Sequence, residues 1–105
     1  MPESDWKLFR ELRELALERF CQCVLAEIGS VAADSGQSHH DRYLAVFKLI
    51  RERDKELAAA FDEPRRSTAL QQLAFIRSRE LLTDEEFARF WPETRETVAV
   101  MLGIR

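Results

Sequence analysis

The chain has 105 residues, a net charge of −3, three glycines, three prolines and no asparagine. Hydrophobic residues make up 46% of it and charged residues 33%, which excludes a disordered chain because such chains bury too little apolar surface. The shortage of turn-forming residues also excludes a β-sandwich or barrel, which needs many tight turns. The composition therefore predicts a single all-α domain over residues 1–105.

Two long amphipathic helices are predicted in the first part of the chain. Apolar residues spaced by three and four predict a helix from Asp5 to about Ala33, with Ser4 as its N-cap. A small, polar, glycine-containing loop follows, and Ser38 is expected to cap a second helix that runs to about Phe61. Because the connecting loop is short, we expect the two helices to form an antiparallel hairpin.

Three shorter helices are predicted to pack across this hairpin. A proline precedes a helix expected over Arg65 to about Arg79. The segment Thr83-Asp84-Glu85-Glu86 is typical of a capping box and opens a fourth helix that continues through Phe90. A fifth helix starts at Pro92, and Gly103 is a natural residue to end it. The predicted fold class is an all-α bundle of four to five helices built on a long antiparallel helical hairpin.

The segment around the capping box resembles a known family. It contains Leu70-Gln-Gln-Leu73 and, after a short turn, Leu82-Thr83-Asp84-Glu85-Glu86-Phe87. Residues 70–87 thereby resemble the short helical oligomerisation domain called SHOCT, in which Leu-Thr-x-Glu-Glu-Phe opens a second helix after a small turn. The sequence departs from that pattern at Glu80, where the family has a glycine, and at residues 89–92, where the family has basic residues. The resemblance implies self-association or docking to another helix, not catalysis.

The sequence contains no pattern typical of catalysis or of metal binding. It has no glycine-rich phosphate loop, serine-centred elbow or paired-histidine metal helix, so we predict a protein that is not an enzyme and has no cofactor. Cys21 and Cys23 point to different sides of one helix, which predicts reduced thiols and no disulfide between them. The same divergence, together with adjacent His39 and His40, argues against a zinc site. A redox or metal role for these four residues stays open.

Large aromatic residues favour a protein partner. Four of them lie near the ends of the first and fourth predicted helices, where they either complete the core or anchor an interface; they are Trp6, Phe9, Phe90 and Trp91. The apolar stripe of the first helix is also wider than a small bundle needs. We therefore predict a bacterial-type interaction or regulatory module that forms a homodimer through this helix and these aromatics.

The same sequence carries no apolar run long enough to cross a bilayer and begins with an acidic, polar segment unlike a secretory signal. We therefore expect a cytoplasmic protein.

A basic segment supports an alternative hypothesis, a small regulator that binds nucleic acid through its third helix. Residues 64–80 carry four basic side chains and one acidic one; the basic ones are Arg65, Arg66, Arg77 and Arg79. The first two lie near the N-terminus of that helix, where a phosphate is readily held. The flanking segments are acidic and would repel a duplex, which favours the simpler interpretation that these arginines complement acidic side chains within the molecule.

Overall fold

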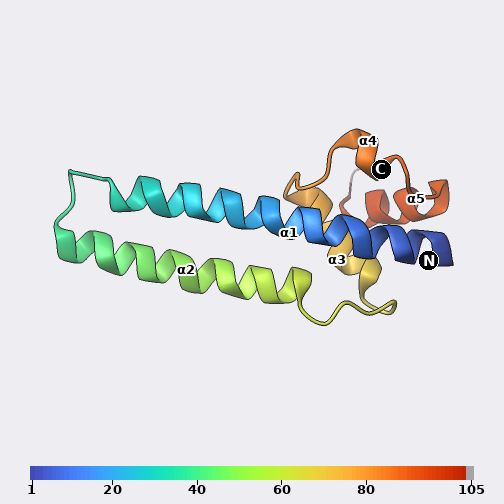
Figure 1. Cartoon of the computed structure of the whole chain (residues 1–105), viewed down its shortest axis with the longest axis horizontal. Coiled ribbons are helices and arrows are strands. Elements are labelled where there is room, and N and C mark those ends of the chain that lie inside the picture. Colours follow the sequence, from blue (N-terminus) through green and yellow to red (C-terminus); the bar gives the residue numbers. More distant parts are fainter. Residues whose placement is uncertain (104–105) are drawn as a thin grey trace.

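A computed structural model describes residues 1–103 and contains five helices and no strand in that range. The helices are α1 (Glu3–Ala32), α2 (His39–Phe61), α3 (Ala69–Ser78), α4 (Asp84–Phe87) and α5 (Pro92–Met101). Figure 1 shows that α1 and α2 run antiparallel, and that α3, α4 and α5 gather at the end of this pair that holds the N-terminus. The molecule is elongated, with extents of 52 × 26 × 21 Å. The predicted all-α fold with a long helical hairpin is confirmed.

Several predicted helix boundaries are confirmed and others are wrong. Ser38 caps α2, because its Oγ accepts a hydrogen bond from the backbone N–H of Asp41 at 3.0 Å. Ser4 is not a cap, since α1 already begins at Glu3. The start predicted for α3 is four residues too early: the segment after Pro64 forms turns instead.

The end of the chain follows the same local rules. Thr83 and Glu86 form the predicted capping box, with each side chain accepting from the other residue's backbone N–H at 3.1 and 2.7 Å. However, α4 ends at Phe87 and not at Phe90, which closes a tight turn by donating its N–H to the carbonyl of Phe87. Gly103 ends α5 with a positive φ of 69°, as predicted.

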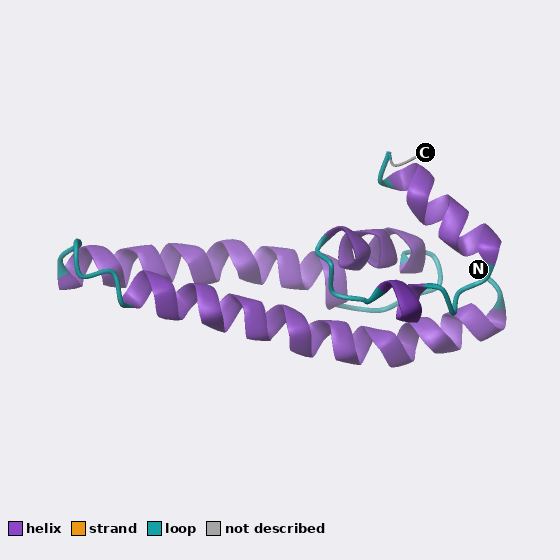
Figure 2. Cartoon of the chain, turned by 90° about the horizontal axis from the view of Figure 1, so that it is seen from above, coloured by secondary structure: helices purple, strands orange, loops and turns teal. Residues whose placement is uncertain are grey.

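The hydrophobic core lies at one end of the hairpin only. The first half of α1 contributes one stripe to this core: Phe9, Leu12, Ala16 and Phe20. The end of α2, α3, the segment around α4 and α5 contribute the other core side chains. No residue from 21 to 59 is buried. We call residues 21–59 the arm, and Figure 2 shows it projecting from the bundle of α3, α4 and α5 as a pair of helices.

Asp5 joins the two ends of the chain. Its side chain is buried, with 1% exposed, and it accepts hydrogen bonds from the N–H of Trp91 at 3.2 Å and from the Thr94 hydroxyl at 2.6 Å. Trp91 is the N-cap residue of α5 but makes no side-chain cap of its own. Helix N-termini leave unpaired N–H groups that need an acceptor. Asp5 on α1 therefore supplies the cap that the local sequence of α5 lacks.

The turn after α3 has a strained residue in a regular capping motif. Glu80 adopts a left-handed conformation with φ of 56°. Its N–H donates to the carbonyl of Arg77, and the N–H of Leu81 donates to the carbonyl of Ile76, at 3.0 and 3.1 Å. These are the two hydrogen bonds of a Schellman motif, in which the left-handed position is usually glycine. A side chain with a Cβ atom is strained there.

We predict that Glu80→Gly stabilises the protein. The substitution removes the steric cost of the left-handed conformation, and the extra backbone entropy of glycine in the unfolded chain offsets part of that gain. The free energy of unfolding should rise by about 0.5–1 kcal/mol, measured by urea denaturation. Glu80→Ala is the matched control, because alanine removes the same charge but keeps the Cβ atom; equal stabilisation by both variants would contradict the backbone argument.

An ion pair connects α1 to the capping box of α4. The guanidinium of Arg19 donates to both carboxylate oxygens of Glu86, at 2.7 and 3.1 Å, and also to the carbonyl of Leu81. The hydrogen bond from Arg19, reinforced by the backbone N–H of Thr83, lowers the pKa of Glu86 from 4.5 to about 2. The carboxylate is therefore favoured in the folded state.

We predict that this pair makes stability depend on pH. Because folding lowers the pKa of Glu86, its contribution is present above pH 4.5 and is lost as the pH falls toward about 2. Both side chains are partly exposed, so we expect a contribution of only about 1 kcal/mol. Urea denaturation should show Glu86→Gln less stable than the natural chain at neutral pH, and the difference should disappear near pH 2. A difference that persists at low pH would contradict the assignment.

Candidate interaction surface

The four aromatic residues that sequence analysis assigned to a partner differ in how far they are buried. Phe9 and Phe90 are buried in the core, with 1% and 2% of their surface exposed, so no partner can contact them and that part of the prediction is wrong. Trp6 stacks on Phe9 at 6.0 Å between ring centroids and packs against the core. Only Trp91 is well exposed, at 52%. These residues do not form one surface patch.

All four arginines of the basic segment are engaged within the molecule. Each has a carboxylate partner within the distance of an ion pair; the pairs are Arg65–Glu63, Arg66–Glu3, Arg77–Asp84 and Arg79–Glu56. The first two arginines precede α3, because that helix begins only at Ala69, and the other two lie at its end. Their partners come from elements on several sides, including α1 and α2. The arrangement supports the interpretation that these arginines complement internal acidic groups.

The cysteines and histidines do not converge on one site. Cys21 is half-buried and Cys23 is exposed, and both are free thiols. His39 and His40 are exposed in the first turn of α2. Within residues 1–103, no three histidine, cysteine or acidic side chains are grouped as metal ligands would be. The geometry therefore offers no reason to assign a metal to these four residues.

The main unpartnered apolar surface of the described residues lies on the arm; sequence analysis indicated the α1 part of it as a wide apolar stripe but not the α2 part. Two hollows share Ile50 and lie end to end along one side of the two helices. In α1 this side includes four residues that are spaced by four, three and four: Cys21, Leu25, Ile28 and Ala32. In α2 the side includes, besides Val46, four apolar residues that are spaced by four, three and seven: Tyr43, Phe47, Ile50 and Leu57. We call these eight residues the arm face.

Large side chains of the arm face are strongly exposed. Leu25 and Tyr43 have 67% of their surface exposed, Phe47 has 53% and Ile50 has 46%. Single exposed apolar residues are common, but a contiguous group of them marks an interaction surface. Spacings that alternate between four and three are also those of helices that pack against other helices in bundles. The arm face therefore has the residue pattern of a helix-packing surface.

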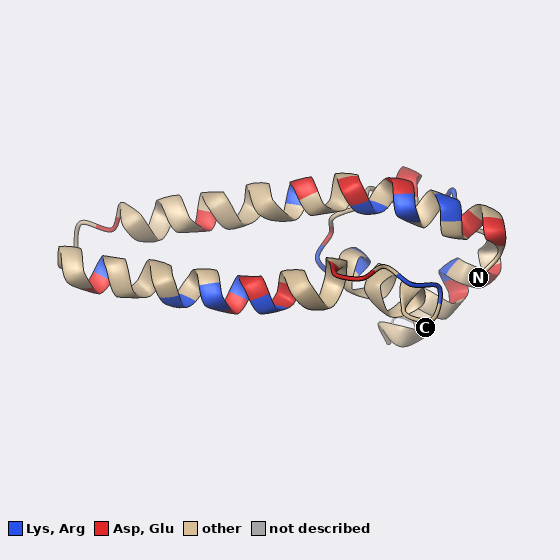
Figure 3. Cartoon of the chain, turned by 60° about the horizontal axis from the view of Figure 1, so that its bottom comes forward, with Lys and Arg blue, Asp and Glu red and all other residues tan. Residues whose placement is uncertain are grey.

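The charge pattern of α1 changes where the arm begins. Residues 3–19 carry nine charged side chains, whereas residues 20–33 carry one, Glu27. Figure 3 shows this nearly uncharged stretch of α1 extending to the tip of the hairpin. Arg53 of α2 holds Glu27 with two hydrogen bonds, at 3.0 and 3.3 Å, which lower the pKa of that carboxyl. A helix segment with so few charges is typical of one covered on several sides.

Hydrogen bonds join α1 and α2 at the tip of the arm and at the core end of α2. At the tip, Arg42 of α2 donates to the carbonyl of Ala32 at 2.9 Å, which satisfies one of the free carbonyls at the end of α1. At the core end, Arg13 of α1 donates to the carbonyl of Phe61, which satisfies one of the free carbonyls at the end of α2. The two helices are thereby held side by side although no residue from 21 to 59 is fully buried.

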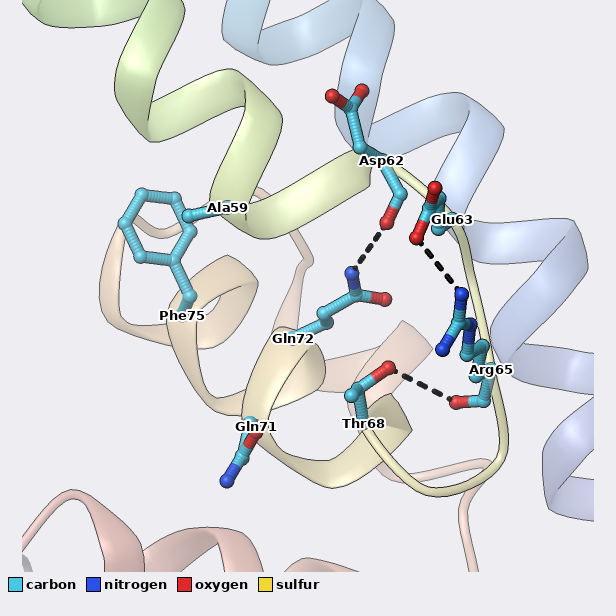
Figure 4. Close-up of a pocket in the computed structure, with 8 residues that line it drawn as sticks. All are labelled: Ala59, Asp62, Glu63, Arg65, Thr68, Gln71, Gln72 and Phe75. Atoms are coloured by element: carbon cyan, nitrogen blue, oxygen red, sulfur yellow. Dashed lines mark hydrogen bonds and ion pairs between the residues drawn. The ribbon is translucent and has the colours of Figure 1, made fainter.

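A third hollow, at the turn between α2 and α3, is lined mostly by polar and charged residues. Figure 4 shows that the Gln72 amide nitrogen points at the carbonyl of Asp62, at 3.0 Å, while Arg65 pairs with Glu63 across the opening. The amide oxygen of Gln72 is buried and has no hydrogen-bond partner among the described residues. The backbone carbonyl of Asp62 can only accept a hydrogen bond. The group of Gln72 that faces it must therefore be the NH₂ and not the oxygen of the amide. The lining mixes both charges and does not favour one class of ligand.

Comparisons of the chain with protein-family models, with curated proteins and with solved structures found no match. The resemblance of residues 70–87 to SHOCT therefore stays a prediction. Within residues 1–103, no helix combines the length and the apolar character that crossing a bilayer requires.

Proposed function

We propose that this protein is a non-enzymatic interaction module that binds an apolar helical surface of another protein chain through its arm face. The observation that carries the proposal is the arm itself, a helical hairpin that exposes Leu25, Tyr43, Phe47 and Ile50 along a side that no other described element covers. An amphipathic helix pair gains stability only when its apolar side is buried against another element. A partner chain would supply that element.

This proposal moves the partner-binding surface from the aromatics at the helix ends to the arm. The arm face presents apolar side chains at helical spacing, which is how helices dock against other helices. The bundle of α3, α4 and α5 then acts as the folded base from which the arm projects. We place the module in the cytoplasm, which is consistent with two free thiols at Cys21 and Cys23.

Site-specific photocrosslinking tests the proposal. A photoreactive phenylalanine analogue at Phe47, on the arm face, should give a discrete covalent adduct with a protein chain in the cells of origin. The same analogue at Ala45 should give none, because Ala45 lies two residues away and points to the other side of the helix. Equal labelling from both positions, or none from either, would contradict the proposal.

A further inference from the structure

We infer that the chain covering the arm face is a second copy of this protein, packed antiparallel to the first so that two hairpins form a four-helix bundle. This inference rests on the proposed function and identifies the partner of the same surface. Two flat helix pairs stacked through their apolar sides are a standard way to close a helical core. In a twofold dimer the same patch serves both copies, so each arm face would cover the other.

The size of the arm face suits such a dimer. The lining of the two hollows that contain it extends along α2 from His39 to Leu57, which is about 28 Å at 1.5 Å per residue. Two helices packed side by side are about 20 Å wide. A patch of that size has about 550 Å² per copy, so a dimer would bury about 1,100 Å², close to the lower limit of specific protein interfaces at about 1,200 Å².

Two charged residues beside the arm face support the antiparallel arrangement. The guanidinium of Arg51 lies over the ring of Phe47, 5.6 Å from its centroid, and Asp54 lines the hollow on the other side of Ile50. If Ile50 meets Ile50 of the second copy, Phe47 lies beside Asp54 of that copy. Arg51, held over Phe47, then reaches this carboxylate, and symmetry forms the contact twice.

The parallel arrangement lacks this complementarity. It would stack α2 of one copy on α1 of the other, where residues 20–33 carry only Glu27, which Arg53 already pairs. Arg51 and Asp54 would then lose water without gaining a partner, which is unfavourable for charged groups. The charge positions thus favour the antiparallel dimer.

Sedimentation equilibrium of the purified full chain tests whether the dimer forms. We expect a mass of twice 12.3 kDa at micromolar concentration. Ile50→Glu should be monomeric, because it places a charge at the centre of the interface. Ala45→Glu is the matched control, since it adds the same charge to the other side of α2, and it should stay dimeric. Circular dichroism checks that both variants remain folded, as expected for exposed positions.

Charge reversal tests the antiparallel register. Arg51→Asp and Asp54→Arg should each weaken dimerisation about tenfold, because each turns two attractive contacts into repulsive ones. A one-to-one mixture of the two variants should recover most of that loss, since the mixed dimer again pairs opposite charges at both contacts. A mixture that binds no better than either variant alone would overturn the antiparallel register.

The outcomes separate this inference from the proposed function. A monomeric natural chain, or a dimer that Ile50→Glu leaves intact, would overturn the second copy as partner. If Phe47 then crosslinks to a different protein, the proposed function stands and only the partner is wrong. If Phe47 gives no adduct and the chain is monomeric, both fail.

Discussion

Replacing Phe90 with alanine should lower the free energy of unfolding by about 3–5 kcal/mol, whereas Trp91→Ala should lower it by about 1 kcal/mol. Phe90 is surrounded by core side chains, and its ring lies tilted against that of Phe87 at 6.0 Å between centroids. Its removal leaves a cavity that the packed surroundings cannot fill. Trp91 exposes 52% of its surface, so truncation removes fewer contacts.

Thermal and urea denaturation of the two variants would measure this difference. A domain of this size has a total stability of about 5–15 kcal/mol, so Phe90→Ala should lose a large part of it and melt at a clearly lower temperature. The adjacent position makes Trp91→Ala a close control for effects on the backbone. Equal losses at the two positions would contradict the placement of Phe90 in the core and Trp91 at the surface.

Asp5→Ala should be the second most damaging of the substitutions considered. The variant leaves the N–H of Trp91 and the hydroxyl of Thr94 without their acceptor, and Thr94 is itself buried, with 4% exposed. Hydrogen bonds to a charged group and the cost of unpaired buried donors together predict a loss of about 2–4 kcal/mol in the free energy of unfolding. The loss should appear as release of α5 from α1.

Hydrogen exchange would locate this effect. Relative to the natural chain, Asp5→Ala should accelerate exchange of the amides at the start of α5. This increase should be larger than that of the arm amides. Asp5→Asn keeps one acceptor oxygen and should lose less. Glu11→Ala is the control on the same helix, because Glu11 is exposed and makes only a long ion pair at 3.9 Å; we expect a change within about 0.5 kcal/mol. An equal loss in Glu11→Ala would contradict a special role for Asp5.

Features that depend on near neighbours were predictable from the sequence. The capping box of Thr83 and Glu86 and the N-cap of Ser38 join residues three apart, so the residue types alone indicate them. The same holds for Gly103 at the end of α5. The cap that Asp5 provides was not predictable, because its partners lie 86 and 89 residues away in the sequence.

The candidate surface could be predicted only in part. The wide apolar stripe of α1 indicates that more than one neighbour covers this helix, but periodicity does not say which half of the stripe the core uses. Phe9 and Leu25 both belong to it, yet Phe9 is buried and Leu25 has 67% of its surface exposed. The difference arises because α3 and α5 pack against the first half of α1 only.

The sequence by itself determined the class of fold, the order of the five helices and the pairing of the two long ones, because periodicity, caps and a short loop act over a few residues. Only the tertiary structure decided which apolar residues are core and which are surface. Burial depends on where distant segments pack, and the three short helices all pack at one end of the hairpin. Because these helices pack there, the arm face stays exposed among the described residues. It is therefore the best candidate for binding a partner.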